Sequence, residues 1–314
     1  MKKTAKKILL ILQIFIGGVA LFYVFKIFWQ SLPELKSYFY SFNWVYLWVA
    51  LFLLIASFLA KGEVWVILMK KVFNSHLSRR SSYAIYYLPQ LVSYAPGGFW
   101  NILGSVKLAK KSGFSRTKTI IVLVLEFVFS LYAGFLLYVI LAFQGKGFDY
   151  VVFYVFLIMV LLGLIILRPS VLNKLLKLVY FIKQTSEEIS PISLKEEIAY
   201  LLGFILFWFL RGIALYYIIL SLFPLKPEYL LSIVAFSTAA WLVAYLFPLA
   251  AGGGLGIMEL LLFSFLQNFL PISVASVVPL ILRIAELGTE LLIILIVFLL
   301  NVDKKDLRFL KLKK

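Results

Sequence analysis

The chain has 314 residues, of which 63% are hydrophobic and only 14% are charged, and its formal net charge is +17. Soluble domains carry roughly 45–50% apolar and about 25% charged residues, so the composition excludes an ordinary water-soluble fold and predicts a membrane protein. The positive charge fits the enrichment of Lys and Arg in cytoplasmic loops, so we expect no nucleic-acid partner. With no cysteine and a single histidine, His76, we expect no disulfide, metal site or cofactor.

The first half of the chain contains long apolar segments of the ~20-residue length that spans a bilayer. We expect transmembrane helices over about residues 8–29, 44–69 and 119–143. The first segment follows a basic N-terminus and could be read as a cleaved signal peptide. Because its apolar run continues to about Trp29 without a clean cleavage site, we interpret it as a helix.

Between the second and third helices, residues 81–113 are only moderately apolar and are interrupted by Pro96, Gly97 and Gly98. Basic residues flank this stretch on both sides, which predicts that both flanks face the cytoplasm. The stretch is too short for two crossings, and one crossing would place one basic flank outside. We therefore predict a re-entrant hairpin of two half-helices, whose break lines a cavity because irregular backbone at membrane depth must be shielded from lipid.

The second half of the chain follows the same order of elements. We expect helices over about residues 150–167, 198–223 and 273–300, and an amphipathic cytoplasmic connector at 168–197. A second broken stretch, residues 229–270, contains Gly252, Gly253 and Gly254 between nearly uncharged flanks. Uncharged flanks are typical of the outer face, so we predict a second hairpin that enters from outside.

The two halves therefore share one order of elements in opposite orientations. The predicted fold is an all-α polytopic membrane protein with about six transmembrane helices and two re-entrant hairpins in an inverted-topology repeat. It is a single membrane domain, 1–314, with repeats at 1–143 and 150–300 and both termini in the cytoplasm. Secondary transporters are built this way, and their substrate sites lie near the membrane midplane where the broken helices meet.

Several charged residues fall inside the predicted helices, where charges are costly and face a partner or a cavity. They are Glu63, Glu126, Arg211, Glu259, Arg283, Glu286 and Glu290. Arg283 and Glu286 are three residues apart and share a helix face. Two interpretations stay open: structural ion pairs between helices, or a polar pathway in which arginine binds a phosphate through its bidentate fork. We interpret Lys26 and Lys61 as side chains that snorkel to the membrane interface.

The candidate transport residues combine these charges with the two breaks and their neighbours. They are Pro96, Gly97, Gly98, Trp100, Asn101, Glu126, Arg211, Gly252, Gly253, Gly254, Glu259, Arg283 and Glu286.

Two motifs at the breaks resemble a known family. They are Tyr94-Ala95-Pro96-Gly97-Gly98-Phe99-Trp100 and Gly252-Gly253-Gly254-Leu255-Gly256-Ile257-Met258-Glu259, the second followed by Arg283 and Glu286. The sequence is similar over nearly its whole length to the lysylphosphatidylglycerol synthase transmembrane, or flippase-like, family. It departs from the family pattern at Gly252, where proline is common, and at Lys107, near a common arginine.

The resemblance implies movement of a lipid between membrane leaflets. Longer relatives add a soluble aminoacyl-transferase domain, for which a chain ending at Lys314 has no room, so we do not expect it to aminoacylate lipid. The main hypothesis is a flippase for an anionic phospholipid or a polyprenyl-phosphate-linked lipid in the cytoplasmic membrane. A proton or sodium gradient is a compatible energy source, whereas the absence of a nucleotide-binding loop argues against direct use of ATP.

Other functions stay open. One is a scaffold or partner of a lipid-modifying enzyme or a glycosyltransferase, docked at residues 168–197. A second is a membrane enzyme acting on a lipid-linked substrate, although no histidine apart from His76 is available as a general base. A third is an ion or small-solute transporter. The transported lipid and the oligomeric state do not follow from the sequence.

Overall fold

The computed structural model describes residues 22–23, 25–30, 32–34, 38, 40–73, 78–92, 100–142, 192–246 and 256–301. These residues form helices and short connections with no strand among them, which confirms the predicted all-α class for this part of the chain. Most of the predicted helix at 8–29, the helix at 150–167 and most of the connector at 168–197 lie outside the described residues.

Four helical segments in the described part are long and apolar enough to cross a membrane, by length and composition. They are α2 (Trp44–Phe73), α5 (Arg116–Ala142), α8 (Leu194–Leu222), and the turn η2 (Pro227–Tyr229) continued by α9 (Leu230–Leu246). The helix α12 (Ile272–Asn301) is also 30 residues long. The helices predicted at 44–69, 119–143, 198–223 and 273–300 correspond to α2, α5, α8 and α12.

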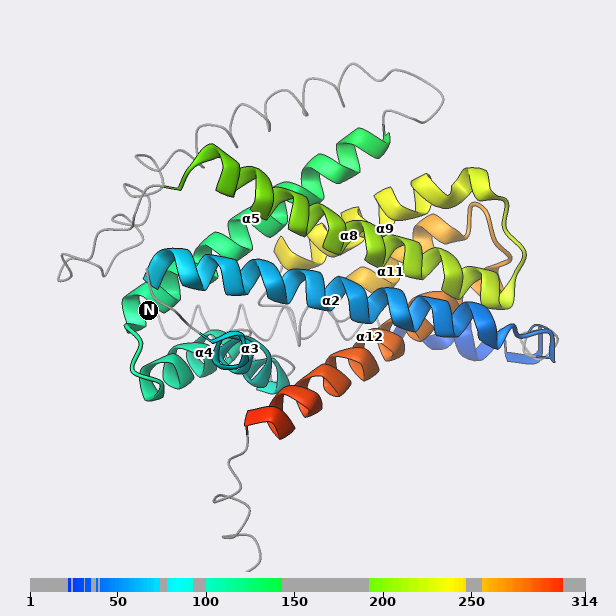
Figure 1. The fold of residues 1–314 in the computed structure, drawn as a ribbon. Helices are drawn as coiled ribbons and strands as arrows, with labels where there is room; N and C mark the ends of the chain where they lie inside the picture. Colours follow the sequence, from blue (N-terminus) through cyan, green and yellow to red (C-terminus); the bar gives the residue numbers. More distant parts are fainter. Residues whose placement is uncertain are drawn as a thin grey trace, which may run out of the picture.

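Helices α2 and α8 lie side by side in antiparallel directions (Figure 1). At one end the backbone N–H of Asn43 donates to the carbonyl of Ser221 at 2.8 Å, and at the other Lys71 forms an ion pair with Glu196 at 2.9 Å. Gly203 lets the two helices approach closely, because a Cβ atom there would collide with the side chain of Val64. Large aromatic side chains such as those of Trp65, Phe204 and Trp208 are fully buried around this pair.

Helix α8 begins four residues before its predicted start because its N-terminus carries a capping box. The Ser193 side chain accepts from the backbone N–H of Glu196, and the Glu196 carboxylate accepts from the backbone N–H of Ser193 at 2.8 Å. These bonds satisfy backbone N–H groups that a helix otherwise leaves without partners. The apolar run alone did not indicate this polar first turn.

The described parts of the stretch predicted as the first hairpin form short helices. They are α3 (Arg79–Tyr87), the 3-10 helix η1 (Leu88–Val92) and α4 (Trp100–Lys111), which contact one another. At about 1.5 Å per residue, the 12-residue α4 is about 18 Å long, well short of a ~30 Å hydrocarbon core. A tight turn with Gly113 at φ +83° connects α4 to α5, a backbone conformation that favours glycine.

The stretch predicted as the second hairpin contains α9 and the shorter α11 (Ile257–Leu266), which pack against each other. Together with η2, α9 is long enough to cross a membrane by length and composition. The physical reason is that residues 230–246 contain no proline or glycine to interrupt the helix. The break at 247–255 lies outside the described residues.

Candidate functional site

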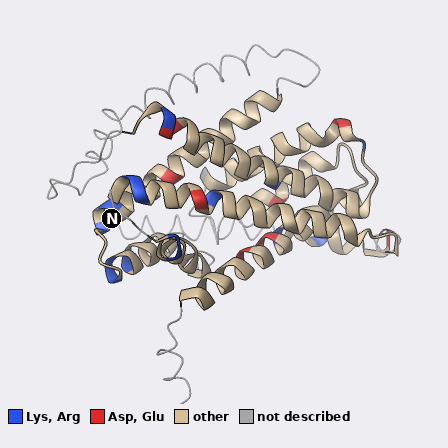
Figure 2. Cartoon of the chain, in the orientation of Figure 1, with Lys and Arg blue, Asp and Glu red and all other residues tan. Residues whose placement is uncertain are grey.

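A cavity of about 530 Å³ lies among α2, α3, η1, α4, α5, α8, α9 and α12. Its walls are largely apolar and aromatic, but six charged residues contribute to the lining, on helices that are otherwise mostly uncharged (Figure 2). These are Lys61, Glu126, Arg211, Arg283, Glu286 and Glu290. Three are cationic and three are anionic, so the charges of the described lining balance.

One buried ion pair joins α8 to α12 beside this cavity. The Nε of Arg211 donates to Oε1 of Glu286 at 2.6 Å, and both side chains are about 5% exposed. Breaking such a pair leaves a charge buried without compensation, which is strongly destabilising. The contact therefore fixes both side chains at the cavity wall.

A second buried pair joins α11 to α12 one turn away. The Nε of Arg283 donates to Oε1 of Glu259 at 2.6 Å. The other oxygen of Glu259 accepts from the backbone N–H of Gly256 at 2.7 Å, which caps the first turn of α11. Gly256 has φ +89°, so glycine is favoured at this helix start. Glu259 thus positions Arg283 and the N-terminus of α11 together.

Trp241 of α9 lies against both guanidinium groups. The Arg211 guanidinium carbon is 3.8 Å from the centre of the Trp241 ring, and that of Arg283 is 4.8 Å away. Tryptophan is the best aromatic partner for a cation, and the interaction strengthens where water is excluded. The indole therefore holds two positive charges at one point of the cavity.

Polar atoms without hydrogen-bond partners gather at this cavity. Six buried side-chain atoms in the described part of the chain have none, and four of them belong to cavity-lining residues. These four are Ser130 Oγ, Trp241 Nε1, Arg283 Nη2 and Glu286 Oε2. Buried polar groups are normally hydrogen-bonded, so these atoms need partners from the cavity, which water or a ligand can supply. Both arginines bond their carboxylates through Nε, so these two bonds do not use the terminal guanidinium nitrogens.

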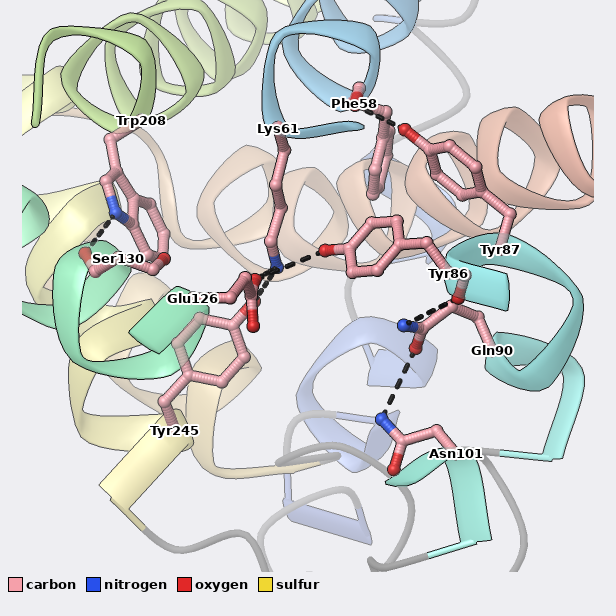
Figure 3. A network of polar contacts seen from close by, with 10 residues as sticks. All are labelled: Phe58, Lys61, Tyr86, Tyr87, Gln90, Asn101, Glu126, Ser130, Trp208 and Tyr245. Carbon is pink, nitrogen blue, oxygen red and sulfur yellow. Dashed lines mark hydrogen bonds and ion pairs between the residues drawn. The ribbon is translucent and has the colours of Figure 1, made fainter. Parts of the chain in front are cut away.

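A separate polar network is centred on Lys61 (Figure 3). The Nζ of Lys61 is 3.1 Å from Oε1 of Glu126 on α5 and 3.5 Å from the hydroxyl of Tyr245 on α9. The hydroxyl of Tyr86 on α3 donates to the same Glu126 oxygen at 3.2 Å. The interpretation of Lys61 as a snorkelling side chain is therefore wrong, because its ammonium group is held inside the helix bundle. Lys26 is exposed.

A family model described as "Lysylphosphatidylglycerol synthase TM region" matches residues 10–296. The chain belongs to this family. No curated protein matches it. With the apolar helices described above, membership of this transmembrane family makes the chain a multi-pass membrane protein.

The cavity is lined by five of the site residues that the sequence predicted. They are Asn101, Glu126, Arg211, Arg283 and Glu286. Glu259 is fully buried behind them as the partner of Arg283. Trp100 is 49% exposed and does not belong to the described lining.

The remaining predicted site residues are those of the two breaks, and they lie outside the described residues. They are Pro96, Gly97, Gly98, Gly252, Gly253 and Gly254. The described residues beside both breaks nevertheless line the cavity: Gln90 and Asn101 around the first, and Ala244 and Tyr245 before the second.

The site contains residues that the sequence did not single out. Trp241, Tyr86 and Tyr245 are aromatic residues among many in this chain, and nothing in their spacing distinguished them. Lys61 did carry a signal: it lies nine residues before Lys70, about 14 Å along a helix, which is near the middle of a bilayer. In the described part of the chain, no group of three or more His, Cys, Asp or Glu could hold a metal ion.

Proposed function

We propose that this protein moves a lipid with a phosphate-bearing headgroup, either an anionic phospholipid or a polyprenyl-phosphate-linked lipid, across the cytoplasmic membrane through this cavity. One observation carries the proposal. Two arginines lie over one tryptophan ring, and each is paired with a carboxylate only through Nε. Terminal guanidinium nitrogens bind phosphate oxygens in a bidentate manner, and the water-poor surroundings strengthen that bond.

The walls of the cavity suit the rest of a lipid. Leu123, Val124, Leu131 and Leu287 are apolar lining residues. Ile120 and Phe127 of α5 line the cavity and are 40% and 43% exposed, which supports access from the surface along α5. A headgroup could therefore occupy the polar end while its hydrocarbon chain contacts the apolar wall.

The short helices α3 and α4 support the re-entrant form of the first hairpin, because neither is long enough to cross a bilayer. In an inverted repeat, the second break would meet the first near the midplane. The cavity-lining residues beside both breaks support that arrangement. On this proposal both termini face the cytoplasm, and a proton or sodium gradient is a compatible energy source.

The test is a dithionite-quench assay in proteoliposomes, with fluorescent phosphatidylglycerol and a fluorescent polyprenyl phosphate as separate substrates. Protein-dependent quenching beyond the outer-leaflet half of the label is expected for at least one lipid. Arg211→Ala should abolish it. The matched control is Arg79→Ala, which removes an exposed arginine whose side chain is 69% accessible and lies outside the cavity.

Quenching that stays at half for both lipids, with and without an imposed proton gradient, would contradict the proposal. It would favour a scaffold for a lipid-modifying enzyme or glycosyltransferase, which co-purification of such a partner would support.

A further inference from the structure

The Lys61 network lies at a different level of the cavity from the two arginines. The antiparallel register of α2 and α8, fixed by the Asn43–Ser221 and Lys71–Glu196 contacts, places Lys61 opposite Ile205. Ile205 precedes Arg211 by six residues, so the backbone positions of Lys61 and Arg211 are offset by about 9 Å along the helix axis.

One aromatic ring connects the two levels. The Nζ of Lys61 is 5.2 Å from the centre of the Phe207 ring, and the Arg211 guanidinium carbon is 5.5 Å from the same centre. Phe207 is fully buried and contributes no polar atom. A phosphate that moves from one of these cations to the other would therefore pass this apolar ring.

The surroundings of Lys61 fit a phosphate. Its ammonium group lines the cavity and lies within 6.0 Å of the rings of Tyr86 and Tyr245, whose hydroxyls are also in the network. The side chains of Lys61 and Glu126 are 15% and 12% exposed, so they are shielded but reachable from the cavity. Lysine has three N–H donors, and tyrosine hydroxyls can donate to phosphate oxygens once Glu126 moves aside.

We propose that Lys61, Tyr86 and Tyr245 form a second phosphate-binding site, the second station. The headgroup occupies it on its way across the membrane, in addition to the site at Arg211 and Arg283, the arginine station. This inference rests on the proposed function and adds an intermediate binding site to the proposed transport path. Glu126 occupies the station in the absence of a headgroup. Exchange of this carboxylate for a phosphate keeps the ammonium charge compensated. The displaced Glu126 carboxyl then has to take up a proton or contact water in the cavity, because a bare charge at membrane depth is costly.

A structural ion pair between α2 and α5 is the competing explanation, and it makes different predictions. Removal of a purely structural pair lowers stability and changes binding and transport together. Removal of an intermediate station slows translocation while equilibrium binding at the arginine station persists. The experiment must therefore measure binding and transport on the same folded variants.

The experiment uses the purified full chain, with dioctanoyl phosphatidylglycerol and farnesyl phosphate as binding probes and the proteoliposome assay for transport. Lys61→Met is expected to slow translocation at least about tenfold while binding of the preferred probe changes by less than about threefold. Lys61→Arg should restore at least roughly a third of the wild-type rate, because it keeps the cation. Glu126→Gln should tighten probe binding about threefold or more, since it frees Lys61 from its carboxylate.

A wild-type rate of translocation by Lys61→Met would overturn the proposal of a second station. A loss of probe binding in proportion to the loss of transport would overturn it as well. Unchanged binding in Glu126→Gln would overturn the role of Glu126 as its occupant. If the wild-type protein itself binds a probe but moves no lipid, the proposed function fails instead. The probe that binds distinguishes a phospholipid from a polyprenyl phosphate as the source of the headgroup.

Discussion

Helix α8 contacts two of its neighbours in different ways. Against α2 the contact is apolar and close, with Gly203 packed on Val64 and large aromatic side chains buried around it. Against α12 the contact includes a buried ion pair between Arg211 and Glu286, beside the cavity. One carboxylate oxygen of Glu286 has no hydrogen-bond partner. The difference teaches that α2 and α8 form a closely packed pair, whereas the α8–α12 contact leaves polar groups at the cavity wall whose bonding is incomplete.

The largest expected effect comes from breaking the ion pair on one side only. Arg211→Met should lower the free energy of unfolding by about 3–5 kcal/mol, because Glu286 is left buried without a partner. The double variant Arg211→Met/Glu286→Met should recover most of that loss, since it removes both charges. Unfolding in mixed detergent micelles, followed by circular dichroism, measures both. Equal losses in the single and double variants would contradict the coupling.

The close apolar contact between α2 and α8 is tested at Gly203. Gly203→Ala should lower the free energy of unfolding by about 1–3 kcal/mol, because the new Cβ collides with Val64 and the stiff valine cannot move away easily. The matched control is Gly288→Ala in α12, where a Cβ meets nothing within 4 Å. The same unfolding assay should show no loss for this control. A tolerated Gly203→Ala would mean that α2 and α8 are not a tightly fixed pair.

A smaller effect is expected at the tryptophan between the arginines. Trp241→Phe should weaken binding of the lipid probe about fivefold, because phenylalanine is a poorer cation partner and lacks the indole N–H. Trp48→Phe is the control: it also replaces an indole by a phenyl ring, but Trp48 of α2 is 68% exposed and does not belong to the described cavity lining. Equal probe affinities for the two variants would remove Trp241 from the site.

The smallest effect is expected at the start of α8, far from the cavity. Ser193→Ala removes the side-chain acceptor of the capping box and should cost about 1 kcal/mol of stability. Lipid translocation should stay at the wild-type rate. A transport defect without a stability change would show that this helix end takes part in function.

The sequence predicts the long helices well and the site only partly. Long apolar runs are sufficient to locate α2, α5, α8 and α12, because hydrophobicity and length decide which segments span a bilayer. The i, i+3 spacing correctly places Arg283 and Glu286 at one wall of the cavity.

The partners of those charges could not be predicted in the same way. Whether Arg211 meets Glu286 or another carboxylate depends on the register and rotation of α8 against α12, which distant parts of the chain determine. The same holds for Lys61. Its depth in the membrane follows from its position in the apolar segment, but its contact with Glu126 depends on how α2 packs on α5. The inverted repeat, the two hairpins and the roles of the break glycines stay predictions.

The most direct test of the central claim, that the buried arginine pair serves a lipid headgroup and is more than a structural contact, is translocation by Arg211→Met/Glu286→Met. Because this double variant should recover most of the stability that Arg211→Met loses, its transport is read without a large folding defect. We predict that dithionite quenching in proteoliposomes then stops at half of the label, as in protein-free vesicles. Quenching at the wild-type rate by the folded double variant would contradict the claim and leave the pair a purely structural role.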